Sequence, residues 1–443
     1  MQFNSLEFLF GFLPLFLAVY LIVPRRLRNV VLILGSLAFY ALASSGHYWW
    51  VAVLAGCTMF TYLVGRGLGC PGRKKLLAAS LFLLAGILVF FKLYQGGRYL
   101  PAGMSFYLFQ MAAYLIDTYR LKYTPERSLV SFAAQMTLFP KLLSGPLMNP
   151  RQLQLECKYC EPDYKNFHDG LQELILGLSL KVLLANRIGG LWNQAAISGY
   201  GNISTPAAWL GLIAYAMQLY FDFYGYSLMA IGLGRMLGYD LPRNFDDPYA
   251  ARSISEFYRR WHVTLGAWFR EYLYFPMGGS RKGMKRTVGN LLVVWLFTGL
   301  WHGVGGNYLL WAGFLCLLII NEQLGLGKYL QKTHVLGRVY TIFVILLSWV
   351  PFAVGDGVQM RIFLGRLFGL GGQSVNPHDF LFWGRQYLGL LLSGVVLATP
   401  FPRKLWRRIR YSTVADLVLF LLFWVVVYYI STAAQDPFLY FQY

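Results

Sequence analysis

Long apolar runs dominate this sequence and limit its fold more than any other feature. A helix of about 20 residues crosses a hydrocarbon core of about 30 Å, and a helix satisfies its own backbone polar groups in lipid. The runs that we interpret as membrane spans are Phe8–Val23, Val30–Ala43, Trp49–Val64, Leu76–Phe91, Met104–Tyr119, Leu171–Leu184, Ala207–Leu237, Val288–His302, Tyr308–Ile320, Val339–Val354, Tyr387–Ala398 and Val414–Ile430. The sequence therefore predicts an all-α polytopic membrane protein with about 11–12 transmembrane helices.

The composition agrees with this interpretation. Hydrophobic residues make up 57% of the chain and charged residues 13%, against about 25% charged in a typical soluble domain. The 39 Lys and Arg residues exceed the 19 Asp and Glu residues, giving a net charge of +20. No basic stretch lies in a soluble domain, so we expect no nucleic-acid partner. Basic loops that face the anionic lipid of the bilayer explain the excess better.

The basic residues also predict the orientation. No Lys or Arg precedes the first apolar run, whereas Arg25, Arg26 and Arg28 follow it directly. Five basic residues between 403 and 410 precede the last run, but the segments Ser44–Tyr48 and Ser431–Tyr443 carry none. A secretory signal has the opposite polarity, so we interpret the first run as a retained span. The positive-inside rule then places the N- and C-termini outside a cytoplasmic (inner) membrane.

Cysteine and motif patterns exclude several chemistries. The five cysteines are an odd number and do not form a disulfide framework. Cys157 and Cys160 make a single CxxC with only His168 nearby, and a structural zinc site usually needs four ligands, so no metal site is predicted. The chain has no HExxH, GxxxxGK[ST] or GxSxG motif. A zinc protease, a P-loop ATPase and a serine hydrolase are therefore not indicated.

The segment Tyr239–Arg286 breaks the apolar pattern, because it is rich in charge yet lies between apolar runs. Within it, Ser255–Pro276 predicts one amphipathic helix. Its large apolar residues recur at three- and four-residue steps: Phe257, Trp261, Leu265, Trp268, Tyr272 and Phe275. Such a helix lies in the membrane interface or dips into the protein. The alternative is a lipid-surface helix with snorkelling arginines.

Two histidines stand apart from the polar loops. His302 ends an apolar run, between Trp301 and Gly303, and His262 lies in the amphipathic segment. An ionisable side chain at membrane depth is costly and usually marks a functional site. Imidazole suits a general base because its ordinary pKa is near 6.5. The alternative for His302 is a neutral ring that is hydrogen-bonded between helices.

Asp222 raises the same question, because it lies in the apolar and aromatic stretch Leu219–Phe223. An unpaired carboxylate there would be expensive. We predict that Asp222 either pairs with a basic residue such as Arg259 or Arg260, or lines a wet cavity where it contacts substrate.

A set of motifs in fixed order runs through the middle of the chain. It comprises Phe139-Pro140-Lys141, Ser144-Gly145-Pro146, Tyr220-Phe221-Asp222-Phe223, Gly225-Tyr226-Ser227, Asn244-Phe245, Arg259-Arg260-Trp261-His262, Gly278-Gly279 and Gly299-Leu300-Trp301-His302-Gly303. Together these residues resemble the membrane-bound O-acyltransferase family. The stretch from Tyr272 through Gly283 is similar to its alginate O-acetyltransferase branch. Leu228 and Leu315-Cys316 depart from that branch's pattern and leave the polymer open.

The resemblance implies a fold and a set of site residues. The fold is a ring of spanning helices around a thinned core with tilted or re-entrant helices and a tunnel. We expect one domain over residues 1–443, with N-terminal spans in 1–130, the motif core in 131–320 and C-terminal spans in 321–443. His302 matches the catalytic histidine and His262 the second histidine of the paired motif. Asp222, Arg259, Trp261 and Trp301 are the expected substrate contacts.

The implied function is an O-acetyltransferase that feeds polysaccharide modification. It moves an acetyl group from a cytoplasmic donor, acetyl-CoA, across the membrane to a secreted or cell-surface polysaccharide, without a cofactor. An extracytoplasmic SGNH-type acetyltransferase is the expected partner. The basic residues Arg281, Lys282, Lys285 and Arg286 either attract the anionic donor or only follow the positive-inside rule.

Other functions remain open at this point. They are transfer of D-alanine or another acyl group from a carrier protein to a cell-wall polymer, and a non-catalytic acyl conduit that serves an extracytoplasmic acetyltransferase. An ordinary solute transporter is the most distant alternative, because the sequence shows no clear internal repeat.

Overall fold

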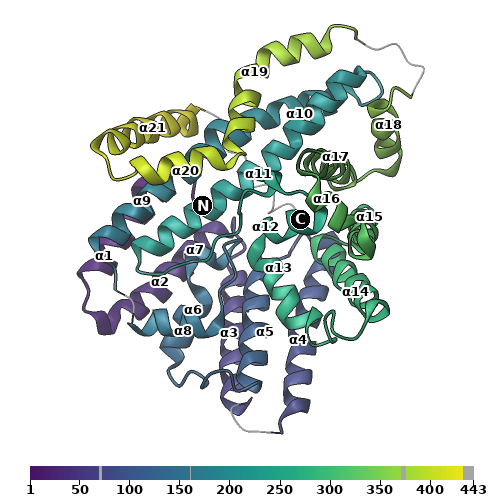
Figure 1. Cartoon of the computed structure of the whole chain (residues 1–443). Coiled ribbons are helices and arrows are strands. Elements are labelled where there is room, and N and C mark those ends of the chain that lie inside the picture. The colour runs from purple at the N-terminus through teal and green to yellow at the C-terminus, as the bar shows by residue number, and fades with distance from the viewer. Residues whose placement is uncertain (69–71, 160, 371–375, 433–443) are drawn as a thin grey trace. The chain divides into compact units, whose positions relative to one another are not determined.

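The computed structural model describes residues 1–68, 72–159, 161–370 and 376–432 (Figure 1). The described residues form helices and no strand, apart from one isolated antiparallel bridge between Phe245 and Trp261. Each apolar run that was predicted to span the membrane is helical. Two predictions fall on residues outside the described ones, namely Cys160 and the tail from residue 433.

Eight helices of the described chain are long and apolar enough to cross a membrane. They are Arg25–Ala43, Trp49–Leu68, Lys74–Gly97, Tyr164–Ser198, Gly306–Lys332, His334–Ala353, Asp379–Leu397 and Thr413–Thr432. A shorter apolar helix covers Glu7–Ile22. Three further predicted spans are helical but lie outside this set: α5 (Met104–Tyr119), α11 (Thr205–Met236) and α14 (Met284–His302). The protein is thus a multi-pass, all-helical membrane protein.

The chain divides into two compact units. The first contains Met1–Leu178, Tyr226–Arg243 and the end of the last helix. Its helices are η1 (Glu7–Phe12), α1 (Leu13–Ile22), α2 (Arg25–Ala43), α3 (Trp49–Leu68), α4 (Lys74–Leu93), α5, α6 (Leu129–Thr137), α7 (Phe139–Leu142), α8 (Pro150–Tyr159) and α9 (Tyr164–Ser179), with the end of α11 from Tyr226 onward. A Cβ on Gly232 would lie 2.4 Å from the carbonyl oxygen of Gly170. Helices α9 and α11 therefore touch backbone to backbone, as small residues permit in membrane bundles.

The second unit contains Ser179–Gly225 and Asn244–Leu421. Its elements are η3 (Leu180–Ala185), α10 (Asn186–Ser198), α11 up to Gly225, η4 (Pro248–Ala250), α12 (Ile254–Arg260), α13 (Val263–Phe269), η5 (Arg270–Tyr274), α14, α15 (Gly306–Asn321), η6 (Glu322–Leu326), α16 (Gly327–Lys332), α17 (His334–Ala353), α18 (Gly357–Leu367), α19 (Asp379–Leu397), α20 (Pro400–Ile409) and α21 (Thr413–Thr432), which it shares with the first unit. Helices α14 and α15 lie side by side (Figure 1). All the predicted site residues belong to this unit. The expectation of one domain over residues 1–443 stays a prediction.

The single amphipathic helix predicted over Ser255–Pro276 is wrong. The segment forms α12, α13 and η5, and the break falls at His262, whose φ is +46°. The backbone N–H of Val263 donates to the carbonyl of Asn244 at 2.9 Å, and that of Asp246 donates to the carbonyl of Arg260 at 3.0 Å. This pairing with a segment before the helix overrides the helical periodicity, because tertiary hydrogen bonds outweigh a local pattern.

Candidate active site

His302 is the last residue of α14 and is 5% exposed. Its imidazole lies among aromatic rings, with ring centroids 4.5 Å from Trp301, 4.9 Å from Trp311 and 5.2 Å from Phe352. The rings of His302 and Tyr308 are nearly parallel, 6.5 Å apart. Helices α14, α15 and α17 all contribute to this setting, so the orientation of the imidazole is fixed by packing from several elements.

The glycine that follows His302 makes room for this arrangement. A Cβ at Gly303 would lie 2.3 Å from Cε2 of Tyr308, a distance that side chains do not tolerate. Asn307 donates from Nδ2 to the carbonyl of Pro351 at 3.0 Å, which ties the start of α15 to α17 beside Phe352. The His-Gly pair is therefore a packing requirement of the site, since any side chain at 303 would push the Tyr308 ring away.

His262 lies between α12 and α13 and is 4% exposed. Its backbone adopts the left-handed region, with φ +46° and ψ +53°, a strained conformation that clusters at functional sites. Its ring packs edge-to-face on Phe223 at 4.8 Å and contacts Trp301 at 6.2 Å. Trp301 therefore contacts both predicted catalytic histidines, and the structure brings His262, Trp301 and His302 into one cluster.

Burial sets the protonation state of His262. Burial lowers the pKa of His262 to about 3, because a low-dielectric environment disfavours the charged imidazolium. His262 is therefore neutral at physiological pH. An efficient general base has a pKa near the working pH, so His262 suits hydrogen bonding and positioning better than proton abstraction.

The backbone around His262 is held by the segment before α12. The hydroxyl of Thr264 donates to Oδ1 of Asn244 at 2.6 Å, in addition to the backbone bonds described above. Trp261 is 4% exposed and packs edge-to-face on Phe245 at 5.1 Å and against Trp349 at 5.3 Å. The predicted substrate contact Trp261 therefore serves at least as a core anchor for the turn that presents His262.

The start of α12 is capped by two side chains. Ser253 accepts the N–H of Glu256 at 3.1 Å, the bond expected at an N-cap. The buried carboxylate of Glu322 accepts the N–H groups of Ile254 at 2.6 Å and of Ser255 at 2.8 Å. Glu322 was not among the predicted site residues. Its signal in the sequence is a lone carboxylate at the end of the apolar run Tyr308–Ile320.

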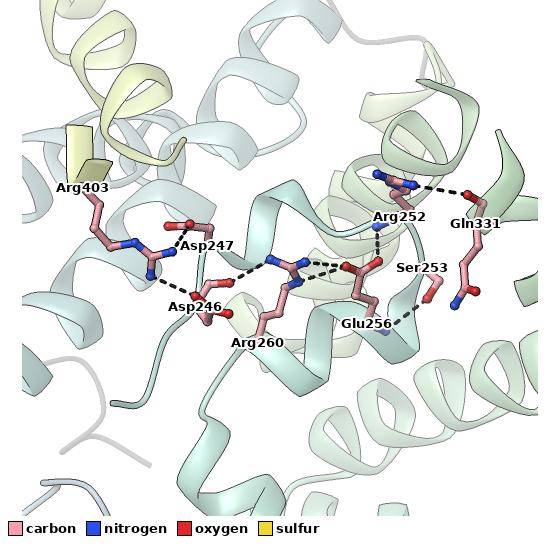
Figure 2. Close-up of polar contacts among 8 residues, drawn as sticks. All are labelled: Asp246, Asp247, Arg252, Ser253, Glu256, Arg260, Gln331 and Arg403. Atoms are coloured by element: carbon pink, nitrogen blue, oxygen red, sulfur yellow. Dashed lines mark hydrogen bonds and ion pairs between the residues drawn. The ribbon is translucent and has the colours of Figure 1, made fainter. Parts of the chain in front are cut away.

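An ion-pair network continues from α12 to α20 (Figure 2). Arg260 donates to Oε1 of Glu256 from Nε at 3.0 Å and from Nη2 at 2.7 Å, and to the carbonyl of Asp246 at 3.2 Å. Arg403 of α20 then binds Asp246 at 2.9 Å and Asp247 at 2.5 Å. The network fixes both of the backbone segments whose pairing forms the turn at His262.

Asp222 pairs with a basic residue, as predicted, but the two partners named as examples, Arg259 and Arg260, are wrong. Asp222 forms an ion pair with Lys181 of η3, and the two side chains are 3% and 1% exposed. Arg260 is engaged by Glu256, and Arg259 is exposed. Asp222 therefore pairs with η3, and the exposed Arg259 is not part of the histidine cluster. Lys181 could have been suspected, since it is the one basic residue within the apolar run Leu171–Leu184.

The basic segment that follows η5 is a tight turn. Gly278 and Gly279 have φ values of +104° and +56°, which glycine adopts without strain. The side chain of Asn290 closes the turn by donating to the carbonyl of Gly279 at 2.8 Å. All four predicted donor-attracting residues are exposed: Arg281, Lys282, Lys285 and Arg286.

The site is a buried histidine cluster in a multi-pass membrane protein, and the similarity to known proteins identifies the class as a membrane-embedded transferase. Residues 75–349 match the model of the membrane-bound O-acyltransferase family. The chain is 32% identical to the probable alginate O-acetylase AlgI of Pseudomonas putida over the full length of both chains. It is 30% identical to the peptidoglycan O-acetyltransferase of Helicobacter pylori over 84% of this chain and 81% of that protein. It is 26% identical to the teichoic acid D-alanyltransferase of Bacillus subtilis over 41% of this chain and 48% of that protein.

The chain therefore belongs to the membrane-bound O-acyltransferase family. It is an O-acyltransferase, as its family and its relatives with O-acetyltransferase names show.

Proposed function

We propose that this protein takes an acetyl group from cytoplasmic acetyl-CoA and passes it across the cytoplasmic membrane for O-acetylation of a secreted or cell-surface polysaccharide. The observation that carries the proposal is the position of His302, buried among Trp301, Trp311 and Phe352, in a chain that aligns over its full length with a probable alginate O-acetylase. The N- and C-termini lie outside in this proposal, and the basic loops lie in the cytoplasm.

His302 acts as the general base in the proposed reaction. Its imidazole takes the proton of the acceptor hydroxyl, and the oxygen attacks the thioester carbonyl of the donor. The tetrahedral intermediate collapses as the carbon–sulfur bond breaks, and the leaving thiolate takes the proton from the imidazolium. A site lined by aromatic rings excludes water, which favours transfer over hydrolysis. Neutral His262 and Trp301 hold the reacting groups in place.

The polar residues around the cluster have supporting roles. Asp222 and Arg259 are the further proposed substrate contacts, and the exposed residues Arg281, Lys282, Lys285 and Arg286 draw the anionic donor to the cytoplasmic mouth. The acetylated acceptor is a relay carrier: an extracytoplasmic SGNH-type acetyltransferase takes the acetyl group from it, the carrier oxygen leaves as a regenerated hydroxyl, and this second enzyme completes the transfer to the polymer. No cofactor takes part in this reaction.

The test supplies radiolabelled acetyl-CoA to the purified protein in proteoliposomes, together with a secreted SGNH-type acetyltransferase and a polysaccharide acceptor. The proposal predicts label on the polymer with wild-type protein and none with His302→Gln, at equal thermal stability of the two proteins. A parallel reaction supplies a labelled D-alanyl carrier protein instead. If this donor labels the polymer and acetyl-CoA does not, the acetyl-CoA proposal is overturned. Undiminished label on the polymer with His302→Gln would leave the protein a conduit without a catalytic base.

A further inference from the structure

Helix α20 is placed by its neighbours at a membrane surface. It follows the span α19 after two residues and precedes the span α21 by three (Figure 1). Ten residues at about 1.5 Å each make a helix of about 15 Å, which is too short to cross a hydrocarbon core of about 30 Å. Since both neighbouring helices are long and apolar enough to span the bilayer, α20 lies where they leave it.

The two faces of α20 differ sharply. Phe401, Leu405 and Ile409 are spaced by four residues and are 65%, 45% and 44% exposed, so they form an apolar stripe on the outside of the protein. The remaining faces carry only basic charge, since α20 contains no Asp or Glu. Lys404, Arg407 and Arg408 are exposed and spaced by three and four residues, and thus share one face.

A single side chain of α20 ties it to the rest of the second unit through ion pairs. Arg403 binds Asp246 at 2.9 Å and Asp247 at 2.5 Å (Figure 2). These ion pairs fix the rotation of the helix about its own axis. With Arg403 turned towards these carboxylates, the apolar stripe and the other basic residues are left for the surroundings. Charge and shape together match a lipid surface, in which acyl chains and anionic headgroups lie side by side.

We propose that α20 binds anionic phospholipid headgroups through Lys404, Arg407 and Arg408, while Phe401, Leu405 and Ile409 enter the acyl boundary. A soluble phosphate ligand such as the donor does not explain the exposed apolar stripe that lies beside these basic residues. The proposal is independent of the transferred acyl group and of His302.

The test measures the binding of short-chain fluorescent phosphatidylglycerol and phosphatidylcholine to the full-length protein in detergent at low salt. Wild-type protein prefers phosphatidylglycerol. In the triple variant Lys404→Gln, Arg407→Gln and Arg408→Gln, the ratio of the affinities for the two lipids falls about 100-fold. Each basic residue near an anionic surface contributes about a factor of five to the affinity. Adding 0.5 M salt removes the same preference from the wild type.

Two matched variants control the experiment. Lys328→Gln, Lys332→Gln and Arg338→Gln remove the same charge from exposed positions elsewhere and keep the preference. Lys404→Arg, Arg407→Lys and Arg408→Lys retain the charge and also keep it. An unchanged preference in the first triple variant, an equal loss in the variant at 328, 332 and 338, or displacement of phosphatidylglycerol by equimolar coenzyme A would each overturn the proposal.

Discussion

The buried pair of Asp222 and Lys181 allows a prediction with a defined magnitude. Both side chains are at least 97% buried, at exposures of 3% and 1%, so neither charge can turn to water when its partner is removed. Removal of one member of a buried ion pair typically destabilises a protein by about 3–5 kcal/mol. At about 2 °C per kcal/mol for a large chain, we expect Asp222→Leu and Lys181→Met each to unfold about 6–10 °C below the wild type.

The double variant Asp222→Leu with Lys181→Met removes both charges and fills the space with apolar atoms. Replacement of a buried pair in this way is often neutral or stabilising, so we expect its midpoint within about 3 °C of the wild type. The assay is thermal unfolding in detergent, followed by fluorescence-detected gel filtration. Acetyl transfer by the double variant adds a second readout: preserved transfer means that Asp222 only pairs with Lys181, whereas lost transfer in a stable protein means that Asp222 contacts substrate.

A more exposed pair provides the control. Glu173 and Arg235 lie 2.8 Å apart, with side chains 9% and 21% exposed, and water reaches Arg235. Glu173→Gln should therefore lower the midpoint less than Asp222→Leu does. Single variants at 222 and 181 that unfold with the wild type, or a double variant as unstable as the sum of the singles, would refute the reasoning.

Three further predictions follow from the site. Gly303→Ala should reduce acetyl transfer at least tenfold while lowering the unfolding midpoint only slightly, because its Cβ displaces the Tyr308 ring beside His302; transfer at the wild-type rate would contradict this packing. Glu322→Ala leaves the buried N–H of Ile254 and the half-buried N–H of Ser255 without their acceptor and should destabilise by about 1–3 kcal/mol, chiefly through Ile254, measured by thermal unfolding, with Glu161→Ala, which removes an exposed carboxylate from a surface ion pair, as control. Since the pKa of His262 is lowered to about 3, the unfolded chain binds a proton below pH 6.5 that the folded protein rejects, so stability should fall as the pH drops from 7 to 4, and His262→Gln should show a shallower fall.

Local features of the sequence are sufficient to predict the helices, and they single out His302 as a candidate catalytic residue. Apolar runs predict helices because each residue's environment is set by its own segment, and every such run is helical in the structure. His302 stood out because an ionisable group at the end of an apolar run needs a reason to be there. Its contacts with Trp311 and Phe352 could not be read from spacing, since they join different helices.

Long-range pairings explain the features that the sequence did not reveal. Lys181 and Asp222 are 41 residues apart, and several basic residues were equally plausible partners for this carboxylate on sequence alone. The break at His262 depends on bonds from Asn244 and Asp246, and the cap on α12 on Glu322, 68 residues after Ile254. A periodic pattern describes one segment and carries no information about these partners.

The proposed catalytic role of His302 is tested most directly by single-turnover acetyl transfer from labelled acetyl-CoA with His302→Gln and His262→Gln in parallel. Both variants are first shown to unfold within a few degrees of the wild type. The proposed role predicts that His302→Gln abolishes formation of acetylated acceptor, while His262→Gln keeps a reduced but measurable rate. A His302→Gln protein that acetylates its acceptor at the wild-type rate would contradict it.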